Sequence, residues 1–136
     1  MRINGIVETA LYVADPGVTA AFYRRLFGFP VLLESERLVA LDVAGKNVLL
    51  LFRAGATQEP VVTEGGTIPG SPGMPPTHFA FAIAGEDVEP WKAKLESEGV
   101  AVESVVTWPR GAKSIYFRDP DGNLAELISP GFWAIY

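Results

Sequence analysis

The chain has 136 residues, 49% of them hydrophobic, no cysteine, and a net charge of −5 near neutral pH. Its length suits one domain or two small fused repeats, and its apolar content is sufficient for a hydrophobic core. The acidic balance argues against nucleic-acid binding, and the lack of cysteine excludes disulfides, thiolate catalysis and zinc–cysteine sites.

The beginning of the sequence, MRINGIVETA, has no apolar stretch of signal-peptide length. The longest apolar runs, such as VLLLF at 48–52, are far shorter than the roughly 20 residues of a membrane-spanning helix. We therefore expect a soluble, cytoplasmic protein without a membrane partner.

The first half of the chain predicts one strand, one helix and three further strands. The first strand ends at Asp15, which is a good helix N-cap, and Pro16 fits the first helical position. Gly28 fits the end of the helix. The three strands that follow are predicted at PVLLES, RLVALDV and NVLLLFR, which are residues 30–35, 37–43 and 47–53.

Residues 54–76 are rich in glycine and proline and show no lasting period, which predicts a long loop or linker. The earlier pattern then starts again. A strand at 77–85 precedes a helix at 86–98 that Gly99 ends, and three strands follow at 100–108, 112–119 and 123–129. The order βαβββ, linker, βαβββ predicts an α+β fold with modules at 1–53 and 77–136, which together form one domain.

The two modules align as an internal repeat. TALYVA at 9–14 lies on FAFAIA at 79–84, so Glu8 aligns with His78. NVLLLF at 47–52 lies on NLAELI at 123–128, so Leu50 aligns with Glu126. The repeat therefore marks equivalent places on the first and last strands, and all of them except Leu50 have side chains that bind metals.

Strand alternation indicates the environment of these places. Glu8 shares a face with Ala10 and Tyr12, and His78 shares a face with Ala80 and Ala82, whereas the bulky apolar residues of both strands occupy the opposite faces. Small neighbours are typical of a cavity wall, and bulky faces suit packing against the helices. Structural explanations stay open, because His78 could be a core histidine, Glu8 could be solvated, and Glu126 could point outward from an edge.

The segments ETALYVAD, AFYRRLFGF, THFAFAIAG and FRDPDGNLAEL resemble the vicinal oxygen chelate superfamily. That group includes glyoxalase I, bleomycin-resistance proteins, fosfomycin-resistance thiol transferases and extradiol dioxygenases. The resemblance implies two βαβββ modules that form a cup-shaped, partly closed sheet, paired in a homodimer. It also implies one divalent metal ion, Mn, Zn, Ni, Co or Fe, held by Glu8, His78 and Glu126 within one chain or across two.

The chain departs from two members of that group. Glyoxalase I has a fourth ligand, a glutamate, where this chain has Leu50, and extradiol enzymes use two histidines where this chain has a single one. Both classical activities are therefore disfavoured. We expect a lyase or isomerase type of metalloenzyme that acts on a small chelating, oxygenated substrate, with Glu126 or Glu8 as the catalytic base. The alternative is a binding protein that sequesters a drug or metabolite without catalysis.

Aromatic and basic residues could form a rim that binds the substrate. Trp108 and Lys113 lie in the loop TWPRGAK, whereas Trp133 lies in the tail SPGFWAIY. Arg53 ends the last strand of the first module. Both tryptophans could instead cover the core or a dimer surface.

Overall fold

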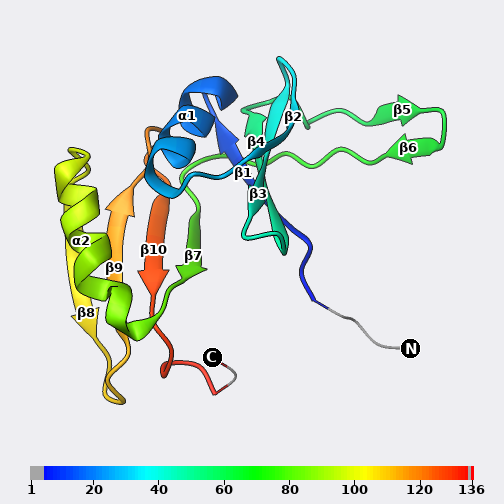
Figure 1. Ribbon diagram of the computed structural model, residues 1–136. Coiled ribbons are helices and arrows are strands. Elements are labelled where there is room, and N and C mark those ends of the chain that lie inside the picture. Colours follow the sequence, from blue (N-terminus) through cyan, green and yellow to red (C-terminus); the bar gives the residue numbers. More distant parts are fainter. Residues whose placement is uncertain (1–4, 135) are drawn as a thin grey trace. The chain divides into compact units, whose positions relative to one another are not determined.

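The structure is a computed structural model that describes residues 5–134 and 136. The chain divides into two compact units, one reaching Pro75 and the other beginning at Pro76 (Figure 1). Each unit has its own four-stranded sheet and its own helix. The predicted α+β class with two βαβββ modules is therefore confirmed.

The first unit forms an open sheet in the order β1-β4-β3-β2, in which β1 runs parallel to β4 and the other pairs are antiparallel. Its βαβββ elements are β1 (Glu8–Val13), α1 (Pro16–Phe27), β2 (Val31–Glu34), β3 (Leu38–Val43) and β4 (Asn47–Arg53).

The predicted ends of α1 are confirmed. The Asp15 carboxylate accepts hydrogen bonds from the backbone N–H groups of Gly17 and Val18, and Pro16 is the first helical residue. Gly28 adopts a left-handed conformation with φ of 70°, and its N–H donates to the Arg24 carbonyl.

The segment predicted as a long loop or linker contains a small hairpin. Strands β5 (Val61–Thr63) and β6 (Gly66–Ile68) pair with each other in a separate two-stranded sheet (Figure 1). Each strand has only three residues, which is too short for an alternation pattern to be recognised among so many glycines and prolines.

The second unit repeats the arrangement of the first, with the sheet order β7-β10-β9-β8. Its helix α2 contacts β8 and β9, and Gly99 follows it with φ of 71°. The elements are β7 (His78–Ala82), the 3₁₀ turn η1 (Gly85–Asp87), α2 (Val88–Ser97), β8 (Val102–Thr107), β9 (Lys113–Arg118) and β10 (Leu124–Ile128).

The strand registers agree with the repeat alignment. In the first unit Ala10 pairs with Leu50 across parallel strands, and in the second unit Ala80 pairs with Glu126 in the same way. Leu50 is thus the counterpart of Glu126 within its own sheet. Each sheet is open, with a free edge at either end of its strand order, so neither unit closes a cup by itself.

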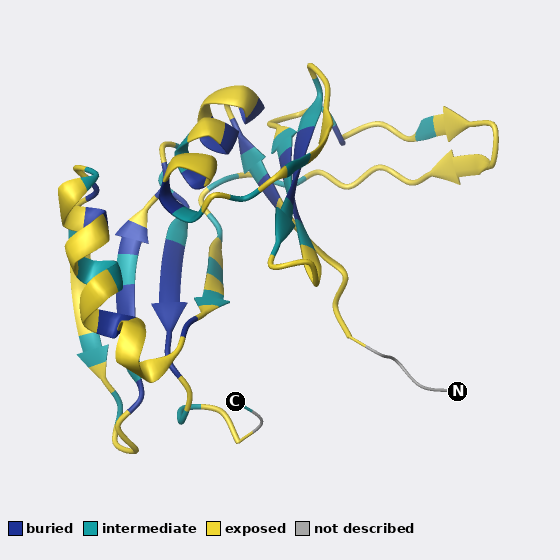
Figure 2. Ribbon diagram, in the orientation of Figure 1, coloured by how far each residue is buried: buried dark blue, intermediate teal, exposed yellow. Residues whose placement is uncertain are grey.

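Burial follows the predicted alternation (Figure 2). Leu11 and Val13 are buried in β1, whereas Glu8 and Ala10 are exposed on the other face. In β7 the phenylalanines are half-buried, whereas His78, Ala80 and Ala82 are exposed. Within the described residues, no helix has both the length and the apolar character needed to cross a membrane.

Candidate metal centre

His78 and Glu126 come together on one face of the second sheet. His78 is the first residue of β7, and Glu126 is the central residue of the parallel strand β10. Glu126 pairs with Ala80, which shares its face of β7 with His78, so the histidine ring reaches the carboxylate. Nε2 of His78 lies 3.3 Å from Oε2 of Glu126.

The other ring nitrogen fixes how His78 presents Nε2. Nδ1 lies 3.0 Å from the backbone carbonyl of Leu124, which only accepts hydrogen bonds, so Nδ1 bears the proton. Nε2 is therefore the ring nitrogen that faces the Glu126 carboxylate, and without a proton on it its lone pair points at that carboxylate. Those two groups repel each other unless a cation, either a proton or a metal ion, lies between them. Metal-binding histidines are held by such a hydrogen bond at the second nitrogen.

The two side chains differ in their access to solvent. The His78 side chain is 51% exposed, whereas that of Glu126 is 7% exposed. A buried carboxylate is costly unless it is paired and hydrogen-bonded. The site thus combines a carboxylate withdrawn from water with an imidazole that incoming ions and ligands can reach.

Tyr116 is the third member of the cluster, and sequence reasoning missed it. It pairs with Glu126 across β9 and β10, and its ring centroid lies 6.3 Å from that of His78. Burial raises the pKa of Tyr116; the Ser114 hydrogen bond opposes this, whereas the charge of Glu126 and its hydrogen bond reinforce it. The signal was present in the sequence, since a hairpin turn at 119–123 places residue 116 opposite residue 126.

The turn between β9 and β10 holds the pair in register. Asn123 is fully buried, and its Oδ1 accepts from both the N–H and the hydroxyl of Thr77, at 2.8 and 3.0 Å. Its Nδ2 donates to Oδ2 of Asp119 at 2.9 Å. Thr77 precedes His78 and Asn123 precedes Leu124, so this network fixes the start of both strands that form the site.

The donor atoms fit a divalent cation. Two neighbouring ligands that each lie about 2.0–2.2 Å from one ion are about 2.8–3.1 Å apart in octahedral and about 3.3–3.6 Å apart in tetrahedral coordination. The His78–Glu126 separation of 3.3 Å matches the tetrahedral spacing and is slightly longer than the octahedral one. Nitrogen and carboxylate donors suit Mn²⁺, Zn²⁺, Ni²⁺, Co²⁺ and Fe²⁺. Among the described residues, no cluster has three or more metal-binding side chains. Glu8 opens β1 of the first unit and is exposed there, and its role as third ligand stays a prediction.

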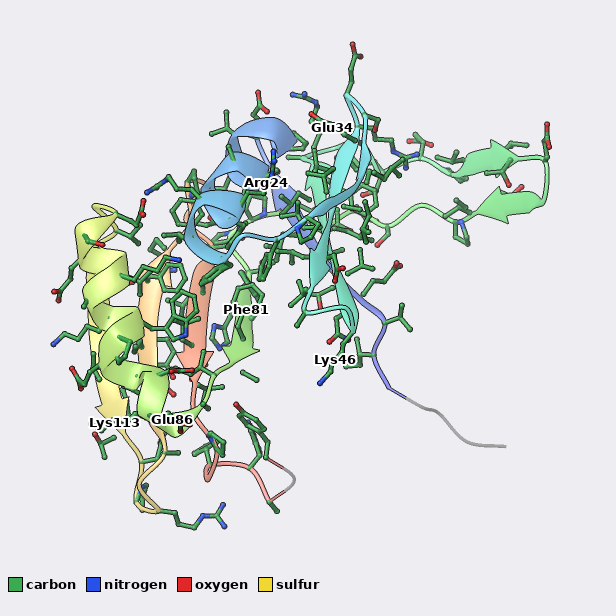
Figure 3. All side chains as sticks on the ribbon, in the orientation of Figure 1. Arg24, Glu34, Lys46, Phe81, Glu86 and Lys113 are labelled. Atoms are coloured by element: carbon green, nitrogen blue, oxygen red, sulfur yellow. The ribbon has the colours of Figure 1, made fainter. Side chains whose placement is uncertain are left out.

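The basic residues of the predicted substrate rim make other contacts. Nζ of Lys113, which is labelled in Figure 3, lies 3.8 Å from Oε1 of Glu89 in α2. Lys113 shares its face of β9 with buried Ile115 rather than with Tyr116, so it lies on the helix side of the sheet. Arg53 belongs to the first unit, where Nε donates to the Glu36 carbonyl at 2.9 Å.

Trp108 and Trp133, the two tryptophans of the predicted substrate rim, belong to one aromatic cluster in the second unit. The ring centroid of Phe132 lies 4.4 Å from that of Trp108 and 4.8 Å from that of Trp133. Trp108 is half-buried, whereas Trp133 is 62% exposed. The indole N–H of Trp108 donates to Oγ of Ser114 at 2.8 Å. Thus Trp108 is hydrogen-bonded to β9, and Trp133 presents an open aromatic surface.

Tyr136 attaches the tail that bears Trp133 to the sheet through its hydroxyl. We predict that this hydroxyl stops stabilising the fold at alkaline pH. The Tyr136 hydroxyl donates to the carbonyls of Ile83 and Ile128 at 2.9 and 3.2 Å, and burial raises the pKa of Tyr136. Because the pKa of Tyr136 is higher in the folded than in the unfolded protein, its protonated hydroxyl adds to the free energy of unfolding. This stabilisation is complete below the unfolded pKa of about 10, and it is lost as the pH rises through the folded pKa.

We therefore expect Tyr136→Phe to lower the free energy of unfolding by about 1 kcal/mol at neutral pH. The difference from the unmodified protein should shrink in alkaline buffer, because the wild-type tyrosine then loses the proton that it donates. Denaturant unfolding of both proteins between about pH 8 and pH 11 measures this difference. A constant difference over that interval would show that Tyr136 does not stabilise the fold through its proton.

The sequence profile of the Glyoxalase/Bleomycin resistance protein/Dioxygenase superfamily matches residues 5–127. Metallothiol transferase FosB of Bacillus licheniformis is 33% identical over 127 residues, covering 93% of this chain and 75% of that protein. The crystal structure of lactoylglutathione lyase from Agrobacterium tumefaciens has a TM-score of 0.89 and 32% identity, covering 98% of this chain and 99% of the other.

A more distant structure is that of the fosfomycin resistance protein FosX from Listeria monocytogenes, solved with Mn(II) and sulfate. It has a TM-score of 0.70 and 23% identity, covering 96% of this chain and 94% of that chain. At this identity the similarity concerns the fold alone.

Proposed function

The chain belongs to the glyoxalase/bleomycin resistance protein/dioxygenase superfamily, and on that premise we propose that it is a divalent-metal-dependent enzyme that acts on a small oxygenated substrate. The observation that carries the proposal is the His78–Glu126 pair, with Nε2 and Oε2 3.3 Å apart and Nδ1 bound to the Leu124 carbonyl. This pair supplies two ligands in a geometry that one cation satisfies.

The third ligand in this proposal is Glu8, from the same chain or from a second copy in a homodimer. Two carboxylates and one imidazole leave coordination positions open for a substrate with neighbouring oxygens. The bound ion would act as a Lewis acid that stabilises negative charge on the substrate oxygen. Glu126 would hold its carboxylate in a buried position, and the half-exposed His78 would border the route by which substrate enters.

Thiol transfer is the reaction type that we favour. FosB is a thiol transferase, whereas the Agrobacterium structure is a lyase of a glutathione adduct. The glyoxalase I pattern has a ligand glutamate where this chain has Leu50, the register counterpart of Glu126. An apolar residue there removes a carboxylate from the site, which favours a three-ligand transferase that needs no second base.

In the favoured reaction a thiol sulfur attacks an electrophilic carbon of the substrate. The new S–C bond forms as a C–O bond of that carbon breaks, and the proton of the thiol is transferred to the released oxygen. A strained cyclic ether such as the epoxide of fosfomycin is a substrate of this class. We place this activity in the cytoplasm, where thiols are abundant and reduced.

The test uses purified full-length protein, loaded with Mn²⁺ or treated with a chelator. Mn²⁺ binding is measured by electron paramagnetic resonance, and product formation is measured with fosfomycin and either glutathione or cysteine. The hemithioacetal of methylglyoxal and glutathione is assayed in parallel as a lyase substrate. We expect Mn²⁺ binding and thiol consumption that require the metal.

Two outcomes would contradict this proposal. Turnover of the hemithioacetal alone would identify a lyase and show that Leu50 does not exclude that chemistry. Protein that binds no divalent metal but binds a drug-like ligand normally would identify the sequestering protein that the sequence left as the alternative.

A further inference from the structure

Residues 70–73, in the loop that leads from β6 to β7, lie against the first sheet. Gly73 touches the ring of Tyr12 so closely that a Cβ atom at residue 73 would come 1.8, 2.1 and 2.2 Å from three atoms of that ring. The Tyr12 ring in turn stacks on Phe52, with the ring centroids 6.1 Å apart. We call residues 70–73 the strap, because their backbone lies directly on an aromatic ring of β1.

The strap is also fastened to the segment that follows β4. The N–H of Ser71 donates to the Thr57 carbonyl at 2.7 Å, and the Thr57 hydroxyl donates back to the Ser71 carbonyl at 2.5 Å. Thr57 is buried, so it is withdrawn from competing water. Gly70 lies so close to Gln58 that a Cβ atom there would come 2.2 Å from the Gln58 carbonyl oxygen. Hydrogen bonds and close glycine contacts thus hold the strap in one place on the first unit.

The strap covers one end of the face that bears Glu8. Leu11 and Val13 are buried on the helix side of β1, so Tyr12 lies on the opposite face. Glu8 shares that face with Tyr12 by strand alternation. The rise of a strand places the Cα atoms of Glu8 and Tyr12 about 13 Å apart. The proposed metal ligand therefore lies at one end of this face, and the strap lies at the other.

The surface between these two ends is apolar. Ala10 is exposed on β1, and its register partner on β4 is the half-buried Leu50. Phe52 pairs with Tyr12 across the same strands, and the guanidinium of Arg37 lies 5.9 Å from the Phe52 ring centroid. An exposed alanine leaves this surface open to a ligand, whereas the two aromatic rings and the strap close its end.

We propose that Tyr12 and the strap form the end wall of the substrate site and select substrates with a short apolar chain. This inference rests on the proposed function, in which Glu8 is a metal ligand and neighbouring oxygens of the substrate bind the ion. A contact distance of about 4 Å at the wall leaves roughly 9 Å of apolar surface. An extended chain advances about 1.2 Å per bond, so chains of up to about seven carbons fit. Tyr12 is then a specificity-determining residue.

Straight-chain alkyl hydroxamic acids are suitable probes, because they chelate a metal ion through two neighbouring oxygens and need no reaction. Isothermal titration of Mn²⁺-loaded protein gives their dissociation constants, from acetohydroxamic to decanohydroxamic acid. Each methylene that reaches the apolar surface is expected to tighten binding about two- to fourfold. This gain should end near octanohydroxamic acid, and decanohydroxamic acid should bind more weakly.

Two substitutions open the wall. Tyr12→Ala removes the ring, and Gly73→Ala displaces the strap, because the strap is a loop whereas the ring is held against Phe52. In both variants the ratio of the decano- to the octanohydroxamate dissociation constant should fall at least about tenfold. Tyr12→Phe keeps the ring and should keep the wild-type ratio. Gly65→Ala is the matched control, because the nearest atom to a Cβ there is 3.9 Å away.

Three results of these titrations would overturn the inference. They are tighter binding of decano- than of octanohydroxamic acid to the wild-type protein, a ratio that neither Tyr12→Ala nor Gly73→Ala changes, and a change of the same size in Gly65→Ala. Hydroxamate binding with the expected length limit but without thiol consumption would reject the proposed reaction and leave this inference standing.

A second measurement needs no metal. In the metal-free protein, octanohydroxamic acid should shift the backbone ¹⁵N–¹H resonances of Ser71 and Gly73, and acetohydroxamic acid should leave them in place. If the wild-type protein binds no Mn²⁺, the proposed function fails, and these resonances alone decide whether an apolar chain reaches the strap. Resonances that do not respond to the longer acid would overturn the inference.

Discussion

Glu126→Gln is expected to lower the affinity for Mn²⁺ by at least about a hundredfold, because loss of a ligand should cost more than loss of a partner that orients one. Glutamine has nearly the same shape, so it keeps its place opposite Tyr116 across β9 and β10. It lacks the negative charge that hard divalent ions prefer in a ligand. Isothermal titration with Mn²⁺ measures the change, and thiol consumption should fall with it.

The fold should tolerate this substitution. The Glu126 side chain is 7% exposed, and a buried charge without a cation is costly, so a neutral amide is at least as stable in metal-free protein. Thermal unfolding in chelator should therefore show a midpoint no lower than that of the wild-type protein.

Glu103→Gln is the matched control for Glu126→Gln. Glu103 also lies in the second unit, but it is exposed and its carboxylate pairs with Arg118 at 2.8 Å. An exposed ion pair of this kind contributes little to stability, and we expect no change in Mn²⁺ affinity. If Glu126→Gln retains Mn²⁺ binding as Glu103→Gln does, Glu126 is not a ligand.

The sequence predicted the architecture because its signals are local. Asp15, Pro16 and Gly28 mark the ends of one helix through their own backbone chemistry, and each was found where the pattern placed it. The repeat alignment also predicted which residues of the two sheets are counterparts, since a strand register follows from the alternation and the turn next to it. That His78 and Glu126 share one site was implied by the family resemblance, and in the structure Nε2 and Oε2 of the two side chains lie 3.3 Å apart.

Tyr116 and Lys113 show where sequence reasoning stopped. Both residues lie on β9, on opposite faces, and only cross-strand pairing shows that Tyr116 meets Glu126 whereas Lys113 meets Glu89 of α2. The sequence grouped Lys113 with Trp108 because both lie in one loop segment. Proximity along the chain does not decide which face of a sheet a side chain occupies, and that face decides whether it reaches the site.

Asn123→Ala is expected to lower the free energy of unfolding by about 2–4 kcal/mol, because it leaves several buried polar groups without partners. The fully buried amide accepts from the N–H and the hydroxyl of Thr77 and donates to Asp119. Alanine removes all three bonds and frees the start of β7, where His78 lies. Mn²⁺ affinity should therefore fall as well, although Asn123 touches neither ligand.

The repeat supplies its own control for this substitution. Asn47 is the counterpart of Asn123 at the start of β4, and its amide donates to the Ile6 carbonyl, but it is exposed to solvent. Because the site is exposed, water can hydrogen-bond to the Ile6 carbonyl once the Asn47 amide is removed. Asn47→Ala should therefore lower the free energy of unfolding by less than about 1 kcal/mol. Urea unfolding of both variants, with Mn²⁺ titration of each, measures the contrast. Equal losses of stability in the two variants would mean that the buried network of the second turn does not hold β7 and β10 together, and that the position of His78 depends on the packing of the sheet instead.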